Sequence, residues 1–271
     1  GMLTTKPSKF LGGKKMGVID LNEWRRICAI NRFKKADDLK FVLNPSTYED
    51  EVFSEEVILE WFKILDAYWI HSGDPKDPHA ELTSGWCSNG FFDCLRVLKY
   101  INLSDILANQ LGKKIRSIMG SQWVEWVIGS PMAGITFAHD LARAIGAPLN
   151  MCVEKDPSDS KGKKMLWNRM NIPPNVPVLQ IEELTTTAKT LNEVEMAIKD
   201  GNGNEVNFVP YVGILVHRPP HLPVDFYGKR KVIALIEKQI WAFPPEECTL
   251  CKQGSKRLRP KTHWKELTGK D

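Results

Sequence analysis

Hydrophobic positions change their spacing along the chain in a way that predicts alternating strands and helices. Short apolar runs predict strands at Val124–Ile128, Leu149–Val153, Val178–Ile181, Asn207–Val216 and Lys231–Ile236. Between them, apolar residues at helical spacing predict helices at Ile135–Ile145 and Thr187–Lys199. This alternation indicates an α/β fold with a central, mostly parallel sheet flanked by helices. Ligands bind such sheets at the C-terminal ends of the strands, so the loops that follow the strands are the place to search for chemistry.

The region before these strands is helical in part. Ser54 is placed to cap a helix, because two glutamates follow it where the helix dipole favours acids. The next apolar residues share one helical face: Ile58, Trp61, Phe62, Leu65 and Trp69. A further helix is expected from Ser104, and a short one around Leu21–Phe33. Residues 1–16 are basic and aperiodic, and we expect them to be mobile.

Composition and charge narrow the possible partners. With 42% hydrophobic and 26% charged residues, the chain has the balance of a globular protein that fills its own core. The net charge of +4 does not argue for nucleic acid, and we interpret the basic stretch from Lys252 to Lys270 as a solvated tail. No apolar run approaches the roughly 20 residues that span a bilayer, so no membrane partner is expected. Scattered cysteines and the lack of an apolar signal core predict a reducing, cytoplasmic setting.

The segment from Val178 to Leu191, VLQIEELTTTAKTL, carries the strongest chemical signal. A buried strand leads into Glu182 and Glu183, and a threonine-rich turn then opens a helix. Backbone N–H groups at a helix start bind anions, and the acids can hold sugar hydroxyls or a metal ion, so the segment suits a sugar phosphate. The alternative is a threonine-rich cap after an ordinary strand. Two glutamates at the end of a buried strand are costly unless they are used, which favours the functional interpretation.

This segment resembles the signature of type I phosphoribosyltransferases, in which a hydrophobic strand and two acids precede a Thr-Thr-Gly-Gly-Thr-like loop. The resemblance implies that Glu182 and Glu183 hold the ribose of phosphoribosyl pyrophosphate. It implies a ribose-phosphate loop of Thr185, Thr186, Thr187, Ala188, Lys189 and Thr190. Glu183 stands where the family usually has Asp, and Ala188 and Lys189 replace the glycine pair. Glycine permits a close backbone approach and positive φ, so an impaired or retuned loop is an open alternative.

Two further segments resemble the same family in the same order. Residues 126–145 resemble the pyrophosphate loop and its helix, which implies pyrophosphate contacts from Ser130, Pro131, Met132, Ala133 and Gly134. A dinucleotide fold also has a strand, a small-residue turn and a helix, but its GxGxxG pattern is missing. The polar loop 154–176 resembles the mobile catalytic loop, and its implied catalytic residues are Lys155, Lys161, Lys163 and Lys164. The alternative for these lysines is a solvated charge run.

Residues 82–96 resemble the hood segment of orotate phosphoribosyltransferases, and we expect residues 80–98 to be extended around a Ser84-Gly85 turn. The resemblance, together with an Arg after the strand that ends at Val216, implies these base-binding residues: Ser84, Gly85, Phe91, Phe92 and Arg218. Cys87 stands where a His or Lys is common, and His217 replaces an Asp. The alternative for this segment is a purely structural hairpin.

The sequence Phe243–Gly254 resembles the C-terminal segment of the longer bacterial orotate enzymes and contains the pair Cys248 and Cys251. Such a pair can be half of a zinc site, completed by His263, Cys87 or Cys94, but the spacing does not require a metal. We therefore predict no metal site and a structural or free thiol pair. The expected organisation is an N-terminal extension (1–54), a phosphoribosyltransferase domain (55–247) with a small hood (80–98), and a basic tail (248–271).

The resemblance implies a reaction: transfer of a 5-phosphoribosyl group from phosphoribosyl pyrophosphate to a nucleobase, orotate first among them, with release of pyrophosphate. It also implies Mg²⁺ as cofactor and a homodimer. The alternatives are the same chemistry on another base, such as a purine, and a regulatory protein that binds phosphoribosyl pyrophosphate or a nucleotide without catalysis. No helix-turn-helix pattern is evident in residues 1–54, so nucleic acid is not an expected partner.

Overall fold

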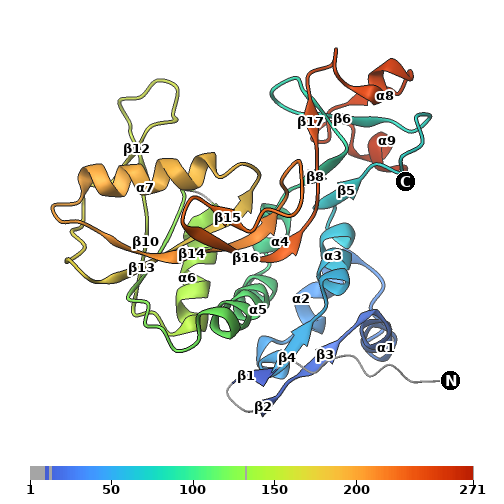
Figure 1. The fold of residues 1–271 in the computed structure, drawn as a ribbon. Helices are drawn as coiled ribbons and strands as arrows, with labels where there is room; N and C mark the ends of the chain where they lie inside the picture. The colour runs from blue at the N-terminus through green and yellow to red at the C-terminus, as the bar shows by residue number, and fades with distance from the viewer. Residues whose placement is uncertain (1–9, 12–13, 132, 271) are drawn as a thin grey trace.

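A central sheet organises the computed structural model, which describes residues 10–11, 14–131 and 133–270 (Figure 1). The strand order is β10-β9-β13-β14-β16-β15. The strands are β10 (Leu149–Cys152), β9 (Trp126–Gly129), β13 (Pro177–Thr185), β14 (Asn207–His217), β16 (Arg230–Glu237) and β15 (Phe226–Tyr227). All neighbours pair in parallel except β15, which runs antiparallel to β16 at the edge. The predicted α/β fold and its mostly parallel sheet are therefore confirmed.

Helices cover both faces of this sheet. Helices α5 (Ile101–Met119) and α6 (Ala133–Ile145) pack with Leu179 and Ile181 of β13 on one face. Helix α7 (Lys189–Gly201) covers the other face, where it packs with Val178 of the same strand. Successive residues of a strand point to opposite faces, so a strand that is buried on both sides reads as a continuous apolar run. This is why the strands could be found in the sequence.

The N-terminal region packs into the same core as the sheet. Strand β3 (Gly17–Ile19) pairs in parallel with β4 (Glu51–Phe53), and Trp24 meets Trp61 edge-on, with 5.7 Å between ring centroids. The other elements here are β1 (Phe10–Leu11), β2 (Lys14–Lys15), α1 (Leu21–Ile30), 3-10 turns Ala36–Asp38 and Pro45–Tyr48, α2 (Leu39–Val42) and α3 (Glu55–Ile64). Ser54 caps α3 as predicted, since its Oγ accepts the Val57 N–H at 3.4 Å. The expected mobility concerns residues that lie largely outside the described ones.

A smaller unit, which we call the hood, lies beyond the C-terminal end of β16 (Figure 1). Its elements are β5 (Tyr68–Ile70), β6 (His79–Glu81), β7 (Cys87–Ser88), β8 (Gly90–Phe92), β17 (Ala242–Phe243), α8 (Thr249–Lys252), β18 (Arg257–Leu258) and α9 (Trp264–Thr268). Four of the strands form a sheet in the order β17-β7-β6-β18. Two predictions need correction here. The lysines of the basic stretch are exposed, as expected, but the stretch is not a separate tail, because β18 pairs with β6 and Leu267 is buried. The segment expected to be extended ends in the short helix α4 (Leu95–Leu98), where Val97 and Leu98 turn into the core.

Candidate active site

A buried loop residue and a buried strand residue meet at the C-terminal edge of the sheet. Strands β9 and β13 are neighbours, with Gly129 level with Ile181, so the residues that follow Gly129 and Ile181 are brought together. Ser130 Oγ donates a 2.7 Å hydrogen bond to Glu182 Oε2, and both side chains are buried. The other oxygen of this carboxyl, Oε1, is buried with no hydrogen-bond partner. The structure therefore joins the predicted pyrophosphate loop to the predicted ribose acids and leaves one oxygen free to accept a hydrogen bond.

Burial sets the electrostatics of this edge. It raises the pKa of Glu182 to about 8, since the charged carboxylate loses its hydration there. Burial also raises the pKa of Glu183 and lowers that of Arg218, whose charge acts on Glu183. Arg218 is fixed at its backbone, where its N–H donates to the Thr185 carbonyl at 2.9 Å, while its side-chain Nε is buried without a partner. Unpaired buried polar groups cost free energy, and they mark places that a ligand can satisfy.

The predicted phosphate turn adopts the conformation for which glycine is normally chosen. Ala188 has φ 62° and ψ 16°, in the left-handed region, and it immediately precedes α7. An L-residue pays about 1–2 kcal/mol for this conformation. The residue is only 3% exposed, and its side chain packs in a small cluster with Leu191 and Val212. Lys189, the first residue of α7, is exposed, and so are Thr187 and Thr190. Ala188 thus adopts the left-handed conformation that glycine permits.

The side chains of His217 and Tyr227 support this turn, although the sequence did not predict this role for them. The Tyr227 hydroxyl donates to the Thr186 carbonyl at 3.2 Å and lies 2.7 Å from His217 Nε2. Because the single hydroxyl proton goes to Thr186, the tyrosine oxygen accepts from His217. His217 is fully buried, and its Nδ1 lies 3.6 Å from Glu237 Oε2. His217 therefore supports the predicted phosphate turn from the neighbouring strand, and the only sequence signal for it was its departure from the family's Asp.

The predicted catalytic loop is a β-hairpin rather than an open loop. Strand β11 (Glu154–Lys155) pairs with β12 (Met165–Leu166), and Asp159 accepts backbone N–H bonds inside the turn between them. Beyond the hairpin, Trp167 and Ile172 are buried in a cluster with α7 residues. The expectation of one loop from 154 to 176 is therefore too broad, because its second half is packed.

The four lysines predicted for catalysis all lie on this hairpin. Lys155 is exposed at the end of β11, and Lys161 and Lys163 are exposed in the turn. Lys164 Nζ lies 3.5 Å from Asp156 Oδ2. Among the described residues, no hydrogen bond or ion pair joins these lysines to Glu182, so their catalytic role stays a prediction. Of the predicted pyrophosphate residues, Met132 lies outside the described part, and Pro131 leads into α6 at Ala133 and Gly134.

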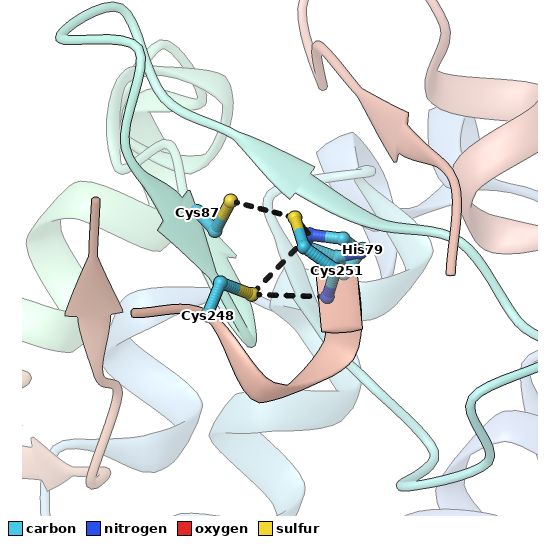
Figure 2. Close-up of side chains that lie close together, drawn as sticks. All are labelled: His79, Cys87, Cys248 and Cys251. Atoms are coloured by element: carbon cyan, nitrogen blue, oxygen red, sulfur yellow. Dashed lines mark hydrogen bonds between the residues drawn. The ribbon is translucent and has the colours of Figure 1, made fainter. Parts of the chain in front are cut away.

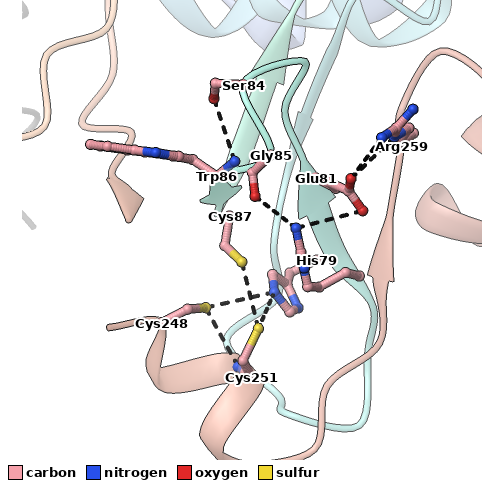
Figure 3. Close-up of polar contacts among 10 residues, drawn as sticks. His79, Glu81, Ser84, Gly85, Trp86, Cys87, Cys248, Cys251 and Arg259 are labelled. Atoms are coloured by element: carbon pink, nitrogen blue, oxygen red, sulfur yellow. Dashed lines mark hydrogen bonds and ion pairs between the residues drawn. The ribbon is translucent and has the colours of Figure 1, made fainter. Parts of the chain in front are cut away.

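The predicted base-binding residues are not all brought to one place. Ser84 and Gly85 lie in a turn between β6 and β7, where Ser84 is exposed and Gly85 is half-buried (Figure 3). The Gly85 N–H donates to the Leu82 carbonyl at 2.9 Å. Phe92, by contrast, is buried with its ring centroid 4.6 Å from Tyr68. Phe91 packs on Trp264 of α9, at 5.7 Å. Both rings are engaged in packing, and no hydrogen bond or ion pair among the described residues joins Ser84 or Gly85 to Arg218. The base-binding role of all five residues therefore stays a prediction.

Cys87 is occupied in the hood. Its side chain lies in a cluster with His79, Cys248 and Cys251, which we call the thiol–histidine cluster (Figure 2). Of the partners considered from the sequence for the Cys248–Cys251 pair, Cys87 is confirmed as a neighbour. His263 instead contacts Thr262, and Cys94 donates to the Glu183 carbonyl at 3.5 Å. His79 was missed, because no local pattern connects it to the cysteines.

Two observations concern features outside the predicted site, namely membrane-spanning helices and a large cavity. Among the described residues, no helix has the length and apolar content to cross a bilayer. A cavity of about 1210 Å³ opens near the N-terminal ends of β14 and β16, lined by residues such as Asn207 and Arg230. None of the predicted site residues lines it, so size alone does not identify the site.

Comparisons with known proteins give a consistent set of relatives. No protein-family model matches the chain. The orotate phosphoribosyltransferase of Pelotomaculum thermopropionicum is 30% identical over 182 residues, covering 67% of this chain and 87% of its own. Those of Desulforamulus reducens (30% over 202 residues; 73% and 95%) and Heliobacterium modesticaldum (31% over 207 residues; 76% and 97%) are similar.

Solved structures show weaker likenesses. Orotate phosphoribosyltransferase from Aeropyrum pernix has a TM-score of 0.44 and 16% identity, covering 66% of this chain and 93% of its own. UMP synthase from Leishmania donovani has a TM-score of 0.44 and 15% identity, covering 70% and 37%.

Proposed function

Because the chain belongs to the orotate phosphoribosyltransferase family, we propose that it transfers a 5-phosphoribosyl group from phosphoribosyl pyrophosphate to orotate and releases pyrophosphate. The single observation that carries the site assignment lies at the end of β13. There a buried carboxyl with one unpaired oxygen precedes a left-handed turn that opens a helix. The carboxyl can bind ribose hydroxyls and the turn can bind a phosphate, so together they suit a pentose that carries a phosphate.

Each part of the site has one task in this reaction. Glu182 Oε1 accepts a hydrogen bond from a ribose hydroxyl, and the turn Thr186–Thr190 binds the 5′-phosphate through its backbone N–H groups. The loop at Ser130 binds the pyrophosphate. The bond from C1′ of the ribose to the pyrophosphate oxygen breaks and leaves its electron pair on pyrophosphate. A ring nitrogen of orotate supplies the pair for the new bond, and the proton that this nitrogen loses is taken up by the released pyrophosphate. The protein's contribution is positioning and charge stabilisation rather than covalent chemistry.

Two cationic groups complement the anionic reactants. Arg218, whose Nε is buried without a partner, pairs with the carboxylate of orotate, for which a guanidinium offers two parallel hydrogen bonds. The hairpin that carries Lys155 moves over the site, where the lysine neutralises the leaving pyrophosphate and the hairpin excludes water. Its exposed turn lysines, Lys161 and Lys163, add to the same field.

We also propose Mg²⁺ as cofactor, a homodimeric assembly and a cytoplasmic setting. The unpaired Glu182 Oε1 and the carboxyl of Glu183 are oxygen donors of the kind that Mg²⁺ prefers, so the residues fit the ion. When bound, Mg²⁺ neutralises charge on the pyrophosphate. All six cysteines lie among the described residues and none forms a disulfide, which suits a reducing compartment.

Pyrophosphate release tests this proposal. Purified protein is mixed with Mg²⁺, phosphoribosyl pyrophosphate and one base at a time: orotate, uracil or adenine. Release is expected with orotate and not with the other two. Release with adenine alone would replace orotate by a purine. Tight binding of phosphoribosyl pyrophosphate in calorimetry without release for any base would favour the regulatory alternative.

A further inference from the structure

The hood brings together four side chains that the proposed reaction does not use. His79 from β6, Cys87 from β7, and Cys248 and Cys251 from the start of α8 place their ligand atoms within 4.8 Å of one another (Figure 2). We propose that these four residues bind a structural zinc ion that ties the C-terminal segment to the hood sheet. Three thiolates and one imidazole are a ligand set that tetrahedral zinc takes in structural sites.

The distances fit a tetrahedron. Cys87 Sγ and Cys251 Sγ are 3.5 Å apart, and His79 Nε2 lies 3.4 Å from Cys251 Sγ and 3.6 Å from Cys248 Sγ. With Zn–S near 2.3 Å and Zn–N near 2.0–2.1 Å, a regular tetrahedron separates two sulfurs by about 3.8 Å and a sulfur from a nitrogen by about 3.5 Å. Shifts of a few tenths of an ångström are enough to admit the ion. The 3.5 Å between the two sulfurs also excludes a disulfide, whose S–S bond is about 2.05 Å.

Hydrogen bonding fixes the histidine in the form that binds metal. His79 Nδ1 lies 2.8 Å from Ser255 Oγ, and that hydroxyl donates its only proton to the Asp77 carbonyl at 2.6 Å. Ser255 therefore accepts from His79, so Nδ1 carries the ring proton. The lone pair of Nε2 then faces the sulfurs. An outer partner that orients the ring in this way is a regular feature of zinc-bound histidines.

The apolar cluster around these four side chains is small. It consists of Cys87, Cys248 and Leu250, with Trp241 and Cys251 packed against it. Three of these five residues are ligands in the proposed site. Small units whose apolar core is this limited are commonly stabilised by a metal ion or disulfides. The Cys251 N–H also points at Cys248 Sγ, at 3.4 Å, which favours a thiolate there.

The site is closed and structural. Protein groups fill all four tetrahedral positions, so none remains for a reacting water. Cys87 and His79 lie on either side of the turn Leu82–Trp86 (Figure 3). Arg257 of β18 donates to the Gly85 carbonyl at 2.7 Å. The ion would thus hold both strands that carry this turn, and through α8 it would hold the segment that supplies Arg257.

Metal analysis of the full chain tests the proposal. The protein is expressed without added metal, purified without a metal-affinity column, and analysed by inductively coupled plasma mass spectrometry. We expect about one zinc ion per chain. Cys251→Ser should lower the zinc content at least about tenfold, because a hydroxyl replaces a thiolate ligand. Cys28→Ser, which removes another partly buried free thiol in α1, should keep the full content.

Two further measurements decide the question even if Cys251→Ser does not fold. Ser255→Ala keeps all four ligands but removes the hydrogen-bond partner of His79. Its zinc affinity, measured by competition with a chromophoric chelator, should be about 10- to 100-fold lower than that of the wild type. Cobalt(II) added to metal-stripped wild type should give the absorption of a tetrahedral thiolate complex. Zinc-free wild type with all thiols reactive, or iron in place of zinc, would overturn the proposal.

Discussion

The C-terminal edge of the sheet and the thiol–histidine cluster both bury polar side chains, but only in the cluster does the protein itself supply partners for the buried polar atoms compared here. At the sheet edge, Glu182 Oε1 and Arg218 Nε are buried with no partner. In the cluster, both ring nitrogens of His79 have neighbours: Ser255 on one side and two sulfurs on the other. Each unsatisfied buried group costs about 1–3 kcal/mol. The sheet edge therefore suits reversible binding of substrates, whereas the cluster suits a permanently bound structural ion.

This difference separates activity from stability. Substitutions at the sheet edge should affect turnover and can raise stability, because they remove groups that the empty site leaves unpaired. Substitutions in the cluster should lower stability and metal content together, because binding of a structural ion is part of the folding free energy.

The largest expected effect is on turnover. Lys155→Ala should lower kcat about 100-fold, since it removes a charge aimed at the leaving pyrophosphate. Lys155 is exposed, so its midpoint of thermal unfolding should not change measurably. Steady-state pyrophosphate release and calorimetry measure the two quantities. Lys229→Ala, an exposed lysine at the other end of the sheet, is the matched control and should leave both unchanged. Full turnover in Lys155→Ala would remove this lysine from the mechanism.

Removal of the metal should sharpen the contrast between the regions. After chelation, backbone amide exchange in β6, β7 and α8 should accelerate at least about tenfold, because local opening no longer breaks metal bonds. Amides of β13 and α7 should keep their protection, since they belong to the core under the sheet. Hydrogen exchange with mass spectrometry measures the exchange rates of both regions in one experiment. Uniform acceleration through the whole chain would show that the hood is not a separate unit of stability.

Glu182→Gln should make stability less dependent on pH. The folded protein holds the pKa of Glu182 near 8, above its ordinary value of 4.5, so between these values the folded state binds more protons than the unfolded state. Stability is therefore lost as pH rises through this window. Denaturant unfolding should show little difference between variant and wild type at low pH, and a gain on the order of 2–4 kcal/mol for the variant above pH 8. Glu205→Gln, an exposed carboxylate, should not show this gain. An equal gain at both pH values would contradict the burial argument.

Ala188→Gly should have the smallest effect. Glycine relieves the left-handed strain at φ 62°, worth about 1–2 kcal/mol, but it also removes a buried methyl group that contributes about 1 kcal/mol. The free energy of unfolding should therefore change by less than about 1 kcal/mol. Ala188→Val keeps the strain and adds bulk in a packed cluster, so it should destabilise by more. A large loss for glycine and none for valine would mean that the turn has another conformation.

The sheet could be predicted from the sequence because its strands are buried on both faces. Apolar runs located five of them, but not their full length. Strand β13 continues to Thr185, four residues past the predicted end at Ile181, because Leu184 and Thr185 still pair with β14. Two glutamates hide this continuation from any hydrophobic pattern. The edge strand Phe226–Tyr227 is too short to leave a periodic signal.

The hood could not be predicted in the same way, since its contacts join distant parts of the chain. The tail was expected to be solvated because basic residues dominate it, yet Leu258 and Leu267 are buried. The CxxC pair was visible in the sequence, but His79 lies about 170 residues away and shares no pattern with it. The predicted phosphate turn was intermediate in how well it could be predicted. Its position in the sequence followed from the family resemblance, but only the structure showed that Ala188 adopts a left-handed conformation, which glycine permits more easily.

The reverse reaction tests the central claim most directly. Orotidine 5′-monophosphate and pyrophosphate are incubated with the protein and Mg²⁺, and the products are separated by chromatography. If the sheet edge holds the pentose phosphate, the pyrophosphate and orotate as proposed, orotate and phosphoribosyl pyrophosphate should appear in equal amounts. Their absence, from protein that binds phosphoribosyl pyrophosphate normally, would contradict the claim that this chain transfers phosphoribosyl groups to orotate.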